Sequence, residues 1–274
     1  MKFQLPIFFA LLFLLTNCSQ LPKTKLSQSG GKIVQYDIVD DSLKIQIDNP
    51  LHCPIRISAS SSDKIFQEKL SKHFPVTATP NKAMVISYWT DKSKEEMPIN
   101  FSAMMGNPND SILKMDMNLP FKKGRQYEVI QGYNGSFSHS SEYSKYALDL
   151  NLAEGDTICA AADGFVVGVI EGYTKGGRSK KWQDYANYIT IFHPEMNLYT
   201  QYVHLMPEGS FVEVGEHVKS GQEIGRSGKT GRTDIEHLHF NVLRANDSGM
   251  QSEQIGFKEG YKGADLKRGD LVKR

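Results

Sequence analysis

Short apolar runs separated by turn residues fill most of this chain of 274 residues, and they constrain its fold more than any other feature. The runs are rich in β-branched, aromatic and aliphatic residues, which is typical of strands. Glycine, proline and asparagine punctuate them. In the C-terminal half no long amphipathic helix is evident, and 66–73 is a short helix candidate in the N-terminal half. The sequence therefore predicts an all-β protein.

The runs form two groups, which predict two domains. The first group is 43–47, 55–59, 83–89 and 112–117. The second is 127–131, 146–150, 165–170, 188–192, 199–205 and 235–243. We expect an accessory N-terminal antiparallel β-sandwich over 33–121. A compact antiparallel β-sheet domain should follow over 122–274 and end in a polar C-terminal tail.

The first eighteen residues differ in kind from the rest, because Lys2 precedes a nearly continuous apolar run over 5–15. A membrane-spanning helix needs about 20 apolar residues, so this shorter segment is typical of a signal peptide. Its Leu-Thr-Asn-Cys ending resembles the lipobox of bacterial lipoproteins, in which a cysteine, here Cys18, is lipidated. A plain secretory signal is the alternative. Either way we expect export to the cell envelope, with 19–32 as a flexible tether and an outer-membrane location if the host is diderm.

Charge and cysteine content narrow the classes of partner and of cross-link. The formal net charge of +1 argues against nucleic acid as a partner, because domains that bind it usually carry a strong basic excess. Cys53 and Cys159 could form a disulfide in an exported protein. Cys159 lies in a run of small apolar residues, however, and Cys53 belongs to the other predicted domain, so we expect two free, buried cysteines.

A His-x-His pair lies on the last predicted strand. Alternation along 235–243 sends Leu238 and Phe240 into a core and leaves His237 and His239 together on the other face. Neutral imidazole is both a common metal ligand and a common general base. On its own, the pair is equally consistent with a functional site and with two surface histidines.

Three further segments place polar groups away from their apolar neighbours. A glycine-punctuated loop at 131–139 delivers His139. Alternation along 146–150 sets Asp149 on a face opposite its leucine neighbours, where an acid is usually solvated. The same alternation along 199–205 directs Tyr202 and His204 to one face.

Taken together, the order of these motifs resembles the lysostaphin-like (LytM-type) zinc metallopeptidases over about residues 125–245. The motifs are Gly-x-x-Ser-His139, Tyr-Ala-Leu-Asp149-Leu, the glycine-flanked segment 155–164, Asn187-Tyr-Ile-Thr-Ile-Phe-His-Pro, Tyr-Val-His204-Leu, the stretch 215–225, and His237-Leu-His239-Phe. Each motif alone is weak, but their ordered combination is specific. The resemblance implies a compact antiparallel β domain with an active-site groove on one sheet.

The resemblance also implies roles for five residues. His139, Asp149 and His239 would bind Zn²⁺, while His204 and His237 would be the unliganded catalytic histidines. Three protein ligands and one open position are what a catalytic zinc site requires. His237 is the candidate for accepting the proton of water, with His204 orienting water or stabilising the oxyanion, and the two roles are exchangeable.

One position departs from the usual pattern of the family. Many relatives have His-x-x-x-Asp, whereas here Lys145 stands four residues before Asp149. A lysine must lose its proton to bind a metal, so we expect His139, on a longer loop, to be the first ligand. The alternative is a site that lacks its first ligand.

The function that the resemblance implies is a zinc metalloendopeptidase that hydrolyses peptide cross-links of bacterial peptidoglycan. Its partners would be peptidoglycan stem peptides or cross-bridges, the membrane through the lipid anchor, and an unidentified regulator of the envelope. Asn187 and Tyr202 are candidate groove residues, and the cationic loop 173–181 either meets acidic stem peptides or is solvated. Two alternatives stay open: a non-catalytic LytM-type activator of other wall hydrolases, and a peptidoglycan-binding envelope lipoprotein.

Overall fold

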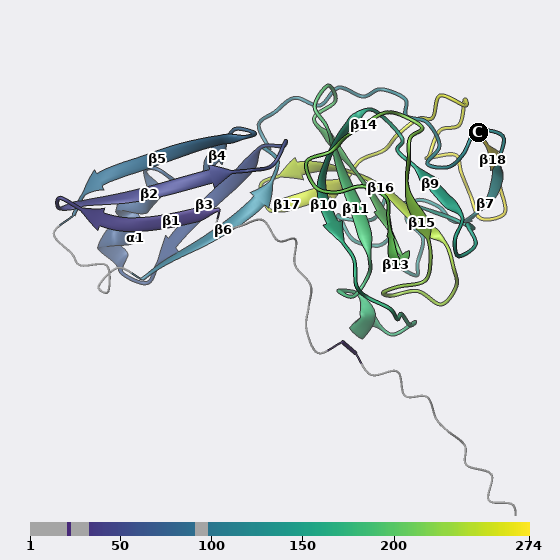
Figure 1. Cartoon of the computed structure of the whole chain (residues 1–274), viewed down its shortest axis with the longest axis horizontal. Helices are drawn as coiled ribbons and strands as arrows, with labels where there is room; N and C mark the ends of the chain where they lie inside the picture. The colour runs from purple at the N-terminus through teal and green to yellow at the C-terminus, as the bar shows by residue number, and fades with distance from the viewer. Residues whose placement is uncertain (1–20, 23–32, 91–97) are drawn as a thin grey trace, which may run out of the picture.

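The computed structural model describes residues 21–22, 33–90 and 98–274. The expected signal peptide and most of the expected tether lie outside the described residues. In the part of the chain that is described, no helix is long and apolar enough to cross a membrane. Almost all regular structure is β-strand, and every pair of neighbouring strands is antiparallel, which confirms the predicted all-β class (Figure 1).

Two three-stranded sheets and one helix make up the N-terminal part. Its elements are β1 (Val34–Val39), β2 (Ser42–Asn49), β3 (Ile55–Ser61), α1 (Lys64–Ser71), β4 (Val76–Ala78), β5 (Lys82–Trp89) and β6 (Ile99–Met105). The sheet orders are β1-β2-β5 and β4-β3-β6. Alternation along β2 buries Leu43, Ile45 and Ile47, and these pack in one core with residues of β3 and α1. Asp63 caps α1, since its carboxylate accepts from the Phe66 N–H at 2.9 Å.

One predicted strand is absent. The run 112–117 forms no strand, and within it Met117 alone makes an isolated bridge, to Phe257. This run is instead part of an extended connection that crosses to the C-terminal part, where Met117 is buried in the core. An apolar run can thus be a linker that packs on a core formed by other strands.

A nine-stranded antiparallel sheet dominates the C-terminal part, in the order β14-β10-β11-β12-β16-β8-β7-β18, with β17 paired to β16. A second sheet has the order β13-β15-β9. The strands are β7 (Gln126–Gln131), β8 (Leu148–Leu150), β9 (Thr157–Cys159), β10 (Gly164–Ile170), β11 (Tyr188–His193), β12 (Leu198–Val203), β13 (Leu205–Ser210), β14 (His217–Val218), β15 (Glu223–Ser227), β16 (Leu238–Asn246), β17 (Gly249–Ser252) and β18 (Leu271–Lys273). A short 3-10 helix, η2 (Lys180–Trp182), lies between β10 and β11. Both sheets contribute to one large core.

The C-terminal end is not the polar tail that the sequence predicted. Phe257, Leu266 and Val272 are buried in the large core. Strand β18 pairs with β7 and so becomes the edge of the nine-stranded sheet. The apolar residues of this segment are widely spaced among charged ones, and for that reason composition alone indicated a solvated tail.

The two parts of the molecule meet through a buried contact, where β6 lies beside β17 (Figure 1). The Arg56 guanidinium is buried there and donates to the carbonyls of Asn246 and Asp247 at 3.0 and 2.8 Å. A small apolar cluster lies in the same region: Cys53, Val167, Phe192, Tyr199 and Leu243. Cys53 and Cys159 are both free and buried, as predicted.

Two strand boundaries differ from the prediction and matter for the site. The run 199–205 is broken at His204, whose φ of 70° is unusual for a residue other than glycine, so β12 ends at Val203 and β13 begins at Leu205. The run 235–243 becomes a regular strand only from Leu238, and His237 precedes it in an isolated bridge to Gly228. Both candidate catalytic histidines therefore lie at breaks in the regular structure.

Candidate metal centre

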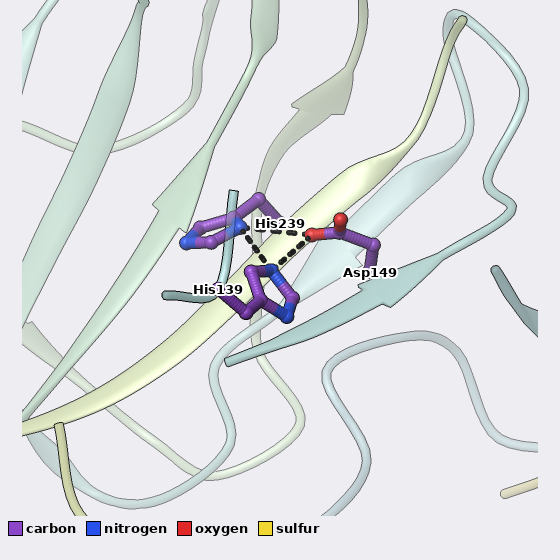
Figure 2. A group of neighbouring side chains, drawn as sticks. All are labelled: His139, Asp149 and His239. Atoms are coloured by element: carbon purple, nitrogen blue, oxygen red, sulfur yellow. Dashed lines mark hydrogen bonds and ion pairs between the residues drawn. The ribbon is translucent and has the colours of Figure 1, made fainter. Parts of the chain in front are cut away.

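Three segments that are distant in sequence bring His139, Asp149 and His239 together (Figure 2). Asp149 is the middle residue of β8, and His239 is its register partner on the neighbouring strand β16, so both side chains point to the same face. His139 comes from the loop between β7 and β8. The structure therefore brings together the three residues expected to be zinc ligands.

The donor atoms of these three side chains form a compact triangle. His139 Nε2 lies 3.1 Å from Asp149 Oδ1 and 3.2 Å from His239 Nδ1, while His239 Nδ1 lies 2.8 Å from Asp149 Oδ1. Ligands bonded to a tetrahedral zinc ion at about 2.0–2.1 Å lie about 3.3 Å from one another. Two imidazole nitrogens and one carboxylate oxygen are also a donor set that zinc accepts. The residues present therefore fit a zinc ion with little rearrangement.

A second layer of contacts fixes the direction of two of the donors. His139 Nδ1 donates to the Gly132 carbonyl at 2.8 Å, which leaves the Nε2 lone pair facing Asp149. Gln131 Nε2 donates to Asp149 Oδ2 at 2.8 Å, so Oδ1 is the oxygen that faces the imidazoles. Gly132 permits this packing, because a Cβ there would lie 2.5 Å from the Leu266 carbonyl oxygen.

His204 and His237, the expected catalytic residues, lie beside the triangle and are both buried. Their ring centroids are 4.6 Å apart. His237 Nε2 lies 3.6 Å from Asp149 Oδ1, while the centroid of His204 is 6.0 Å from that of His239. All five residues singled out from the sequence therefore form one cluster.

Burial and mutual charge set the proton balance of the cluster. Burial alone would raise the pKa of Asp149, but the charge of His237 and the hydrogen bonds from His139 and His239 hold it well below its usual range. Burial lowers the pKa of His204, reinforced by the charges of the two His-x-His imidazoles, and it lowers the pKa of His239. Burial opposes protonation of His139, yet its bond with Asp149 raises its pKa. A buried carboxylate anion thus faces His204 and His239, whose lowered pKa values favour the neutral imidazole, while the same anion favours the protonated form of His139 when no metal is bound.

A cleft of about 710 Å³ adjoins the cluster, and His204 and His239 are among the residues that line it. This volume is in the range of typical ligand sites. Its other lining residues include Phe137, Ser138, Tyr143, Tyr188, Gln201, Val203 and Arg232. Tyr143 donates its hydroxyl to Gln201 Oε1 at 3.0 Å, which ties the loop carrying His139 to β12. The cluster is therefore open to a ligand on this side.

The two residues expected to line the groove do not line it. Tyr202 is fully buried in the large core, where its hydroxyl accepts from the Ala161 N–H at 2.8 Å. The break at His204 is the reason, because it uncouples His204 from the alternation of β12 and leaves Val203 on the cleft side. Asn187 is also fully buried, and its Nδ2 donates to the Tyr173 carbonyl at 2.8 Å.

Sequence reasoning missed the residues that do line or support the cleft. Gln201 and Val203 share a face of β12, so the period-two alternation of a strand could have predicted that they line the cleft together. Gln131 carried no signal, because its contact with Asp149 depends on the irregular pairing of β7 with β8. Lys145 lies apart from the ligand triangle and pairs with Glu142 at 2.8 Å.

Comparison with known proteins shows which family this chain resembles. The model described as peptidase family M23 matches residues 143–251, which contain every cluster member except His139, just ahead of the match. A peptidoglycan DD-endopeptidase, ShyC, from Vibrio cholerae is 39% identical over 89 residues, which are 32% of this chain and 18% of that protein. An uncharacterized metalloprotease from Haemophilus influenzae is 33% identical over 93 residues, 34% of this chain and 17% of that protein.

These alignments span less than a fifth of the length of either curated relative. Among solved structures, the catalytic domain of the antimicrobial peptidase lysostaphin from Staphylococcus simulans is 25% identical, with a TM-score of 0.33 over 47% of this chain and 87% of that domain. The sequence match to the family model includes Asp149, His204 and the His-x-His pair. The chain therefore carries a peptidase family M23 domain, which confirms the family that its sequence resembles.

Proposed function

We propose that this protein is a zinc metalloendopeptidase that hydrolyses peptide cross-links of bacterial peptidoglycan. The observation that carries the proposal is the triangle of His139 Nε2, Asp149 Oδ1 and His239 Nδ1 in an M23 domain, in which His139 and Asp149 are buried and His239 lines the cleft. The substrate class is supported by the Vibrio cholerae relative, which is named as a peptidoglycan DD-endopeptidase.

In the proposed mechanism, His139, Asp149 and His239 hold zinc. A zinc ion there would polarise the scissile carbonyl and lower the pKa of a water molecule to about 7. Asp149 contributes the negative charge of the ligand set, since its pKa lies well below the usual range and it is ionised at neutral pH. The cleft holds the peptide against this centre and excludes bulk water from one side of it.

The hydrogen bonds of the two remaining histidines assign their proton-carrying atoms. His237 Nδ1 donates to the Ile235 carbonyl at 3.0 Å, so Nε2 is the nitrogen that can take a proton from water. His204 Nδ1 donates to the Thr230 carbonyl at 2.6 Å, and its lowered pKa keeps it neutral, so its Nε2 is also an acceptor. In its resting state His204 can therefore accept a proton at Nε2 but cannot donate one from that atom.

These hydrogen bonds restrict the catalytic roles that His204 and His237 can take. An oxyanion needs a hydrogen-bond donor, and His204 supplies one only after it has taken up a proton. We therefore assign proton acceptance to His237, which lies closer to Asp149, and orientation of the attacking water to His204. Whichever histidine takes the proton can then give it to the leaving amine.

The test is the release of soluble muropeptides from purified peptidoglycan by the full chain, with and without a zinc chelator. The His237→Ala variant removes the proposed base, and His217→Ala, an exposed histidine of β14, is the matched control. We expect release by the wild type and the control, and loss of release with the chelator or in His237→Ala. The products identify the bond that is cut.

A folded, zinc-loaded protein that releases nothing from several wall types would refute the peptidase proposal. Two further assays of the same protein, sedimentation with the walls and addition to a second wall hydrolase, would then separate the two other functions considered from the sequence. Retention on the wall favours a binding lipoprotein, and stimulation of a second wall hydrolase favours an activator.

We also propose that the protein is exported and anchored to a membrane by a lipid on Cys18. The support is the lipobox-like sequence alone, which lies outside the described residues. Mass spectrometry of the mature N-terminus tests it: a diacylated cysteine is expected, and an unmodified N-terminus would refute it. The Cys18→Ser variant should then leave the membrane fraction.

A further inference from the structure

A cationic side chain, Arg232, is held in place on the wall of the cleft next to the metal centre. Its Nη2 donates to the Phe137 carbonyl at 3.0 Å, and its guanidinium lies over the Phe137 ring, 4.8 Å from the centroid. These two contacts fix the plane of the guanidinium. A fixed plane lowers the entropy cost of binding a ligand in one orientation.

Most of the hydrogen-bonding capacity of Arg232 is unused. A guanidinium has five N–H donors, and among the described residues only Nη2 of Arg232 has an acceptor. Its Nε is shielded from water and has no partner in the described part of the protein. No described carboxylate forms an ion pair with it. The Nη donors that are not bonded to Phe137 are therefore available to an anion in the cleft.

The charges around the cleft favour an anionic ligand. Lys180, at the start of η2, lines the same cleft and adds a second positive charge. Asp184 is the single carboxylate among the lining residues. Arg178, by contrast, lies 3.7 Å from Asp234 and is not among the lining residues. The cleft thus has a cationic excess even before the charge of a metal ion is counted.

We propose that Arg232 is a specificity-determining residue that binds a free carboxylate of the substrate, with Lys180 as a supporting charge. This inference rests on the proposed function and narrows its substrate class. The preferred substrate is a peptide that carries a free carboxylate close to the scissile bond. The same peptide with that carboxylate converted to an amide is a poor substrate, because an amide offers no negative charge to the planar fork of the guanidinium.

A purely structural role for Arg232 has to be separated from this one, since its bond to Phe137 also ties the loop carrying His139 to the turn before His237. Loss of that tie would lower activity on every substrate alike. Loss of carboxylate recognition would lower activity on the acid and leave activity on the amide unchanged. The ratio of the two activities is therefore the measurement that distinguishes the roles.

The experiment uses cross-linked muropeptide dimers, native and with their carboxylates amidated, and measures kcat/KM with wild type, Arg232→Gln and Arg232→Lys. Arg268→Gln, at an exposed arginine outside the cleft, is the matched control. We expect the wild type and the control to prefer the acid by about 10- to 100-fold, the range expected for a hydrogen bond to a charged group. The ratio should fall close to one in Arg232→Gln and be intermediate in Arg232→Lys.

Equal activity of the wild type on acid and amide would overturn the inference and leave the proposed function intact. So would an equal loss on both substrates in Arg232→Gln. If the wild type cleaves neither substrate, the proposed function fails, and binding of fluorescently labelled acid and amide then decides the inference separately. Equal Kd values for the two would overturn it, and tighter binding of the acid, lost in Arg232→Gln, would support it.

Discussion

Replacing Gln131 by alanine should weaken zinc binding although Gln131 is not itself a ligand. Its Nε2 donates both to Asp149 Oδ2 at 2.8 Å and to Ser138 Oγ at 2.7 Å, and its Oε1 accepts from the Phe137 N–H at 3.1 Å. One side chain therefore orients the carboxylate ligand and braces the loop that carries His139.

The size of the effect follows from these contacts. Without Gln131, Asp149 Oδ2 loses its one side-chain donor among the described residues, while Oδ1 keeps its imidazole partners. A hydrogen bond to a charged group is worth about 1.5–3 kcal/mol. Loss of an outer contact to a metal ligand typically costs about 10- to 100-fold in metal affinity. Both routes give the same range, so we expect a rise in the zinc Kd of about 10- to 100-fold.

The assay is competition for zinc between the protein and a chromophoric chelator at neutral pH. Gln222→Ala is the matched control, because its Oε1 accepts from the backbone N–H of Lys219 in a turn outside the metal cluster. The control should bind zinc like the wild type. A zinc Kd for Gln131→Ala within twofold of the wild type would refute the idea that Gln131 positions Asp149. Circular dichroism of both variants checks that each is folded.

Three further predictions concern the fold and the metal. His193 is fully buried, and burial lowers its pKa from 6.5 to about 4. As the pH falls, the unfolded chain therefore takes up a proton at His193 before the folded protein does, and about 3 kcal/mol of stability should be lost between pH 6.5 and 4. Urea unfolding of His193→Gln should show a shallower pH dependence in that window, and parallel profiles would contradict this. Arg56→Met should lower the free energy of unfolding by about 2 kcal/mol, because two carbonyls at the contact between the two parts lose a charged donor; a change below about 0.5 kcal/mol would count against it. Removal of zinc should lower Tm, since a ligand at 100 times its Kd stabilises the folded state by about 2.7 kcal/mol, and an unchanged Tm would argue against a specific site.

The all-β class could be predicted from the sequence because the residue patterns that indicate strands are local. The alternation along 43–47, the β-branched and aromatic run at 188–192, and the turns rich in glycine and proline can be recognised without knowledge of the rest of the chain. What could not be predicted depends on distant partners. Run 112–117 has the apolar content of a strand but no neighbour to pair with, and the segment around Leu266 becomes core only because β18 pairs with β7.

The same distinction applies to the candidate site. His139, Asp149 and His239 were identified from ordered motifs, which preserve the chemistry that the fold assembles. Asn187 and Tyr202 were misplaced, because their exposure depends on three-dimensional packing around them. Alternation predicts a face only while the strand continues, and it gives no warning of a residue that takes a positive φ.

The break at His204 links the fold to the site. There the chain leaves β12 of the nine-stranded sheet and enters β13 of the smaller one. A positive φ at a histidine is unfavourable, and it persists where the surroundings over-determine it. His204 Nδ1 donates to the Thr230 carbonyl, the Thr230 hydroxyl donates to the Leu205 carbonyl, and the Asn187 N–H donates to that hydroxyl. Asn187 thus acts on the site through the backbone that it fixes: it holds the crossing point between two sheets, and that crossing turns the His204 imidazole toward the cleft.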